Sequence, residues 1–166
     1  MLPHIVFASG DSGLTQTACD RLRQWGLIVR VNADFSLSED RAAPDGKTAV
    51  ALLDIREDIG TALRWLRAVK TRQPGLEVLL INQPEHIENS MAGMHAGASD
   101  ELTVPLDLSE LRRKIMAALL RWEKKSRRKR RTSLTRIFEE AMTAVTFAQA
   151  GDFDTAREVL RESEKS

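Results

Sequence analysis

The sequence predicts an α/β fold, in which a doubly wound parallel sheet of five strands is followed by an α-helical hairpin. Short apolar runs rich in β-branched residues alternate with amphipathic helical segments over residues 1–122. The runs are apolar almost throughout, as expected of strands buried on both faces of a parallel sheet. The length of 166 residues, with 42% hydrophobic and 30% charged side chains, suits one such domain with a smaller appendage.

Local composition places the individual elements. Apolar runs that end at glycine, proline or polar residues predict strands at residues 4–8, 27–31, 48–55, 77–82 and 100–104. Apolar residues at helical spacing predict helices at residues 14–25, 59–72 and 85–96, and a fourth that Ser109 caps and that runs at least to Trp122. Residues 36–47 are polar and contain a proline and a glycine, which favours a loop.

The carboxyl ends of the strands are where functional groups gather in a doubly wound sheet. The side chains at these ends are therefore the candidate site, and they belong to Ser9, Gly10, Asp11, Asp54, Asn82 and Val104.

Two stretches at these strand ends resemble the receiver domain of response regulators. Residues 97–111 are similar to the family's Gly-Ala to Pro-x-Asp segment, and Leu52-Leu53-Asp54 is similar to its third strand. The resemblance covers residues 1–122. It implies a receiver-like domain of two-component or phosphorelay signalling, with Asp54 as the phosphoacceptor.

The sequence departs from the receiver pattern at most of the other positions of the phosphoryl site. The resemblance implies two acidic residues after the first strand, a hydroxyl after the fourth, an aromatic residue in the fifth, and a lysine before the proline. The residues that stand at these switch and phosphate-site positions are Ser9 and Gly10, Asn82, Glu101 and Val104.

These departures weaken the chemistry that phosphorylation needs. Phosphoryl transfer to a carboxylate depends on a cation and on fixed donors around the phosphate oxygens. Asp11 and Asp54 could still hold Mg²⁺ weakly, through two carboxylates, and no other cofactor is expected. Alternatively Asp54 is a remnant of the fold, or Arg56 pairs with Asp54 or Asp58 and takes the cation's place.

Residues 121–131 hold eight basic side chains and one acidic one, although the formal net charge of the whole chain is only +1. One interpretation is a solvated linker or helix extension over residues 123–132. The other is an electrostatic contact with nucleic acid, an anionic membrane or an acidic partner. The candidate side chains for that contact are Arg127, Arg128, Lys129, Arg130 and Arg131.

The tail, residues 133–166, predicts a helical hairpin. Its two helices are expected at residues 133–150 and 153–163, with a break at Gly151-Asp152, and their small and aromatic residues resemble one tetratricopeptide repeat. A lone amphipathic hairpin must bury its apolar face, on its own body, on a second copy of the chain or on another protein. A homodimer is therefore expected.

These observations favour a bacterial cytoplasmic signalling protein that is not an enzyme. Its expected partner is another protein, such as a sensor kinase or a downstream protein, and a nucleic-acid-associated regulator is the alternative. The single cysteine, Cys19, excludes an intrachain disulfide. Membrane insertion is not expected, because no apolar run approaches the roughly 18–20 residues that a membrane helix needs.

Overall fold

The computed structural model describes residues 4–33, 35 and 48–149. The predicted loop at 36–47 and the second predicted tail helix lie outside these residues. The described chain contains five strands, which are β1 (His4–Ala8), β2 (Ile28–Asn32), β3 (Thr48–Asp54), β4 (Glu77–Asn82) and β5 (Asp100–Thr103). Its helices are α1 (Ser12–Gln24), α2 (Ile59–Arg72), α3 (Ile87–His95) and α4 (Leu108–Gln149).

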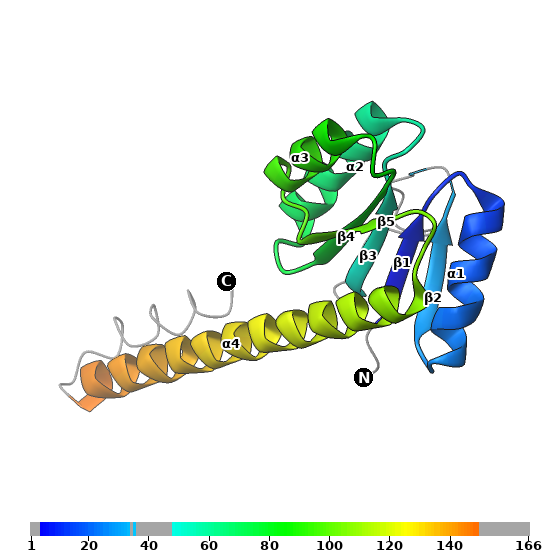
Figure 1. Ribbon diagram of the computed structural model, residues 1–166. Coiled ribbons are helices and arrows are strands. Elements are labelled where there is room, and N and C mark those ends of the chain that lie inside the picture. The colour runs from blue at the N-terminus through cyan, green and yellow to red at the C-terminus, as the bar shows by residue number, and fades with distance from the viewer. Residues whose placement is uncertain (1–3, 34, 36–47, 150–166) are drawn as a thin grey trace. The chain divides into compact units, whose positions relative to one another are not determined.

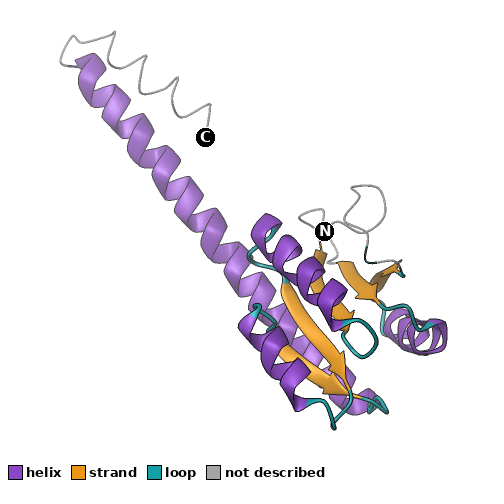
Figure 2. Cartoon of the chain, turned by 90° about the horizontal axis from the view of Figure 1, so that it is seen from above, coloured by secondary structure: helices purple, strands orange, loops and turns teal. Residues whose placement is uncertain are grey.

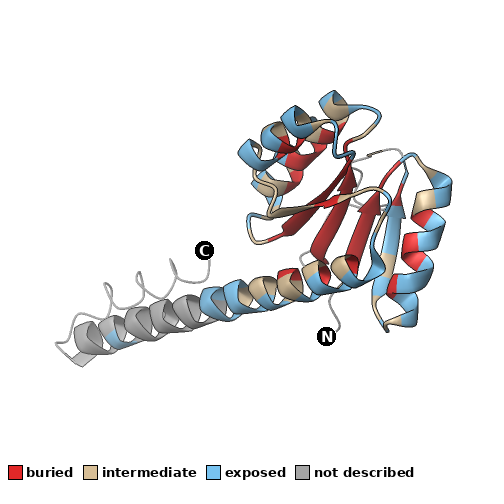
Figure 3. Cartoon of the chain, in the orientation of Figure 1, coloured by how far each residue is buried: buried red, intermediate tan, exposed pale blue. Residues whose placement is uncertain are grey.

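The strands form one parallel sheet in the order β2-β1-β3-β4-β5, which confirms the predicted doubly wound fold (Figure 1). Seen from above, helices cover both faces of the sheet (Figure 2). One core packs α1 and the first part of α4 against one face, and the other packs α2 against the opposite face. Strands β3 and β4 are buried along their whole length, which explains why the sequences between their polar end residues are continuously apolar (Figure 3).

The element boundaries lie close to the predicted ones, and one predicted cap is wrong. The helix expected at 59–72 and the strand expected at 77–82 are found with those bounds. The last helix begins one residue before Ser109, which therefore lies in its first turn. A carboxylate oxygen of Asp107 accepts from the backbone N–H of Glu110 at 2.7 Å, so Asp107 provides the cap.

The backbone of α4 is helical from Leu108 to Gln149 and includes residues 123–132. The chain divides into two compact units, Met1–Glu123 and Lys124–Ser166. Within the described residues, no helix combines the length and the apolar character needed to cross a membrane.

Candidate functional site

The carboxyl ends of β1 and β3 bring four polar side chains together. The two strands are neighbours in register, with Ala8 opposite Leu53, so the residues that follow, Ser9 and Asp54, are adjacent across the sheet. Asp11 lies two residues beyond Ser9, and Arg56 lies two residues beyond Asp54. Sequence positions 9–11 and 54–56 therefore form one cluster.

Asp54 is the centre of this cluster and is 5% exposed. Its Oδ2 accepts from the hydroxyl of Ser9 at 2.7 Å and from Arg56 Nη2 at 2.8 Å. Its Oδ1 accepts from Arg56 Nε at 2.9 Å and from the backbone N–H of Arg56 at 3.1 Å. Both carboxylate oxygens are thus used, and the buried charge is compensated by a bidentate guanidinium.

Arg56 also reaches the second carboxylate of the cluster. Its Nη2 donates to Asp11 Oδ2 at 3.0 Å, so one guanidinium bridges Asp54 and Asp11. The hydrogen bond to Asp54 is the main reason that the pKa of Arg56 is raised above its usual value, although burial opposes it. Of the two partners expected for Arg56, the structure has Asp54, while Asp58 caps α2 through the backbone N–H of Thr61.

Asp11 has two structural roles beside its contact with Arg56. Its Oδ1 accepts from the backbone N–H of Leu14 at 2.9 Å, which caps α1. That hydrogen bond, followed by the contact with Arg56, holds the pKa of Asp11 below its usual value. The backbone N–H of Asp11 in turn donates to the hydroxyl of Ser9 at 3.0 Å. The turn after β1 is therefore fixed to Asp54 through Ser9.

This arrangement does not fit a divalent cation. Mg²⁺ needs open oxygen ligands in octahedral geometry. Both oxygens of Asp54 face Arg56, and the two oxygens of Asp11 are used by Leu14 and by the same guanidinium. In the described part of the chain, no three acidic, histidine or cysteine side chains cluster in a way that would hold a metal. Arg56 occupies the position between the carboxylates that a cation would need.

Asn82 lies at the end of β4, but its side chain contacts α3 instead of Asp54. Its Nδ2 donates to the backbone carbonyl of His86 at 2.6 Å and to the hydroxyl of Ser90 at 2.8 Å. Its backbone carbonyl accepts from the N–H of Val104 at 3.0 Å. Asn82 therefore fixes the start of α3, and Val104 contributes an apolar side chain to a neighbouring pocket.

Glu101 belongs to a separate cluster on β5. Its backbone carbonyl accepts from Lys114 Nζ, and the same ammonium pairs with Asp100 at 3.2 Å and with Glu110 at 3.1 Å. Lys114 thus joins β5 to the first part of α4. The structure does not bring Glu101 into contact with the Asp54 cluster.

Comparisons with known proteins agree with this fold. No family model matches the chain. A curated relative from Mycobacterium tuberculosis, "Probable transcriptional regulatory protein TcrX", is 28% identical over 163 residues, which are 96% of this chain and 63% of that protein. The uncharacterized transcriptional regulatory protein YkoG of Bacillus subtilis is 27% identical over 116 residues, which are 70% of this chain and 50% of that protein. The chain therefore spans about half to two thirds of the length of these relatives.

The solved structures decide the fold. A CheY-like response regulator receiver domain from Methanospirillum hungatei superposes with a TM-score of 0.65, at 22% identity, over 75% of this chain and 99% of that one. The chain has the CheY-like receiver fold. The receiver domain of NtrX from Brucella abortus superposes similarly, with a TM-score of 0.61 at 23% identity over 69% of this chain and 97% of that one.

The receiver-like sequence motifs located Asp54 correctly at a strand end, but they did not reveal the contacts of Ser9. Ser9 stands where the resemblance implies an acidic residue, and its hydroxyl donates to Asp54 instead. A signal was available in the sequence, since a serine at a strand end opposite an aspartate can donate where a carboxylate would repel.

The basic segment lies on α4. The side chains of Arg127, Arg128 and Lys129 are exposed. Those of Arg130 and Arg131 are not among the side chains that the structure describes. Arg121, the first basic residue of the segment, pairs through Nε with Glu77 Oε2 at 2.8 Å. Glu77 is 1% exposed, so Arg121 compensates a buried charge of the receiver fold.

Proposed function

We propose that this chain is a bacterial, cytoplasmic response-regulator-like protein that acts through protein contacts and without phosphorylation of Asp54. The observation that carries the proposal is the bidentate contact of Arg56 with Asp54. The same guanidinium also donates a hydrogen bond to Asp11. The similarity of the chain to transcriptional response regulators supports the signalling role.

The contacts of Arg56 oppose phosphoryl transfer in two ways. The attacking oxygen of Asp54 is held by charged hydrogen bonds, each of which contributes about 1.5–3 kcal/mol. The cation that would neutralise the phosphate oxygens has no open ligands between Asp11 and Asp54. A phosphoryl donor would have to displace the guanidinium before either requirement could be met.

A non-enzymatic role is part of the same proposal. Ser9 is the one hydroxyl in the Asp54 cluster, and it donates to a carboxylate with no histidine beside it among the described contacts. Nucleophilic catalysis by serine needs an adjacent base that accepts its proton. The geometry of this cluster supports structural roles for its members.

Protein contacts are supported by exposed apolar side chains on the receiver fold. Ile87, Met91 and Met94 of α3 are 68%, 57% and 39% exposed, and their spacing of four and three residues places them on one helical face. Methionine-rich surfaces suit adaptable protein interfaces. We propose that the partner is a signalling protein, a sensor kinase or a downstream protein, and that the chain forms a homodimer.

Beryllofluoride with Mg²⁺, a phosphoryl mimic, tests the proposal. We expect no change in the amide spectrum of the wild-type chain by NMR, with Asp54→Ala as the matched control. Saturable shifts in the wild type that disappear in Asp54→Ala would show a working phosphoacceptor and overturn the proposal.

A nucleic-acid-associated regulator is the second candidate, favoured by the exposed cations on α4. Five basic side chains within six residues are exposed, namely Lys124, Lys125, Arg127, Arg128 and Lys129. Electrostatic binding to DNA should weaken steeply between about 50 and 200 mM salt, because counterions are released. A gel-shift titration at both salt concentrations tests this, and absence of binding at the lower one excludes it.

A further inference from the structure

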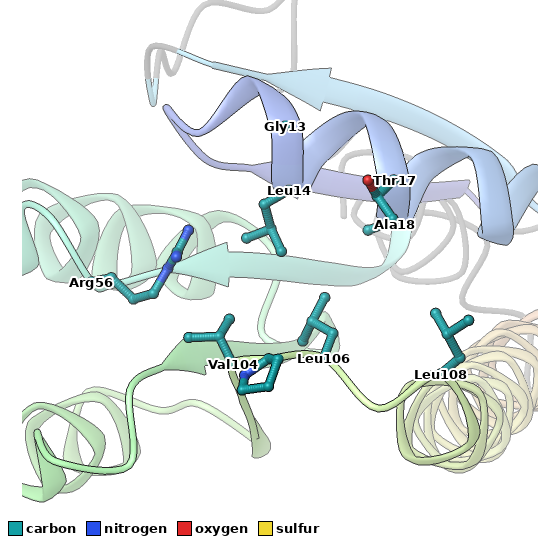
Figure 4. A pocket seen from close by; sticks show the side chains of 9 residues that line it. Gly13, Leu14, Thr17, Ala18, Arg56, Val104, Leu106 and Leu108 are labelled. Atoms are coloured by element: carbon teal, nitrogen blue, oxygen red, sulfur yellow. The ribbon is translucent and has the colours of Figure 1, made fainter.

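A pocket of about 350 Å³ lies beside the Asp54 cluster, between α1, Arg56 in the turn after β3 and the β5–α4 connection. Figure 4 shows Arg56 at one end and Leu108 at the other, with Leu14 facing Val104 and Leu106 across the space. Sites for small organic ligands have volumes of about 300–1,000 Å³ and mostly apolar walls. This pocket falls at the small end of that range.

The walls contain few polar groups. Aside from the glycine at the start of α1, the lining side chains are aliphatic except for Arg56 and Thr17. The guanidinium of Arg56 uses Nε and Nη2 for Asp54 and Asp11. Its Nη1 makes no hydrogen bond to any residue that the structure describes, and the planar fork directs this nitrogen away from the edge that faces Asp54. Arg56 is thus the one charged residue among those that line the pocket, and its Nη1 is a donor that Asp54 and Asp11 do not use.

The net charge around Arg56 determines which kind of ligand can accept a hydrogen bond from it. One guanidinium faces the two carboxylates of Asp11 and Asp54, so the cluster carries a net charge of −1 when all three groups are ionised. An anionic ligand would meet this net negative charge in addition to the donor. A neutral carbonyl or ether oxygen accepts from Nη1 without that repulsion.

We propose that the pocket binds a small neutral molecule with an apolar body and one carbonyl-type acceptor, which Arg56 Nη1 hydrogen-bonds. Because Arg56 also hydrogen-bonds Asp54, a ligand that binds in the pocket and contacts Arg56 directly affects the Asp54 cluster. The inference goes beyond the proposed function, since it assigns a ligand site to the receiver fold.

Three probes of similar size test the site: acetophenone, benzoate and ethylbenzene. The measurement is a titration of the methyl-labelled 166-residue chain by NMR, followed at Leu14, Val104 and Leu106. We expect acetophenone to bind with a dissociation constant of about 1–10 mM, as small ligands do. Benzoate and ethylbenzene should each bind about tenfold more weakly, because one meets the net negative charge and the other lacks the acceptor.

Two variants separate the pocket from unspecific binding. Leu108→Trp narrows the far end at a residue that is 38% exposed, and should abolish the acetophenone shifts without unfolding the chain. Val104→Phe fills the middle and should do the same, with a thermal melt as the check of folding. Equal binding of all three probes, shifts that persist in folded Leu108→Trp, or no saturable shift in the wild type would overturn the proposal. None of these results depends on the beryllofluoride experiment, so the two proposals fail separately.

Discussion

Replacement of Arg56 by methionine removes the guanidinium from the Asp54 cluster while keeping a side chain of similar length. Asp54, whose side chain is 4% exposed, would keep its hydrogen bond from Ser9 and lose the bidentate partner. Breaking a buried ion pair by removing one member costs about 3–5 kcal/mol. The Arg56 side chain is 16% exposed and that of Asp11 is 35% exposed, so we expect the low end, about 3 kcal/mol.

Chemical denaturation of Arg56→Met measures this loss, with Arg64→Met as the matched control. Arg64 is exposed on α2, and its hydrogen bond is to the Thr61 hydroxyl at 2.9 Å, so its replacement should change stability by less than about 0.5 kcal/mol. The double variant Arg56→Met/Asp54→Asn should recover about 2 kcal/mol of the loss, because no uncompensated buried charge remains.

Mg²⁺ provides the second readout on the same variant. With the guanidinium removed, Asp11 and Asp54 have open oxygens facing one position, so Arg56→Met should be stabilised by Mg²⁺ whereas the wild type should not. At a tenfold excess over the dissociation constant the gain is about 1.4 kcal/mol. An Arg56→Met variant as stable as Arg64→Met, with no response to Mg²⁺, would refute the reasoning that Arg56 replaces a cation.

Three further predictions concern the receiver fold, and each is checked by thermal or chemical denaturation. Gly93→Ala should destabilise it by about 1–3 kcal/mol, because the added Cβ would overlap the buried side chain of Leu80, and a variant as stable as the wild type would contradict this. Arg121→Met should cost about 1–3 kcal/mol by leaving Glu77 buried without this partner, and Glu77→Gln in the same background should recover part of the loss. The hydrogen bond from the backbone of Thr61 holds the pKa of Asp58 below its usual 3.8, so the stability that this cap contributes is present above that pH and is lost as the pH falls through the lower, folded-state pKa. Asp58→Asn should reduce the pH dependence of the melting temperature in that acidic window, and an unchanged slope would contradict the assignment.

The fold could be predicted because the alternation of apolar strands with amphipathic helices is repeated along the chain. Strands such as β3 and β4 are buried on both faces, so the side chains between their polar end residues must be apolar, and the glycines and prolines between elements mark the turns. The cap of α4 was not predictable to one residue, since Asp107 and Ser109 are both good capping residues. Which one caps depends on where the chain leaves the sheet after β5.

The site could be predicted only in part, since its contacts depend on the geometry of short turns. Functional side chains gather at the carboxyl ends of parallel strands, so Asp11 and Asp54 are expected to lie near each other. The sequence alone leaves two possible partners for Arg56, Asp54 and Asp58. The structure resolves the choice because Asp58 is used at the start of α2, where its carboxylate accepts from Thr61. No spacing rule predicted that Asn82 would bond to α3 instead of Asp54, because that depends on the path of the β4–α3 connection.

A tethered guanidinium differs from an exchangeable metal ion in one physical respect. Binding of Mg²⁺ to two carboxylates depends on the Mg²⁺ concentration, whereas Arg56 is two residues from Asp54 and is present at a fixed, high effective concentration. The balance of charge at the strand ends is therefore set by the sequence and does not vary with cation supply. A ligand that contacts Arg56 would change this site, and the proposed pocket is lined by Arg56, whose Nη1 is left unused by Asp54 and Asp11.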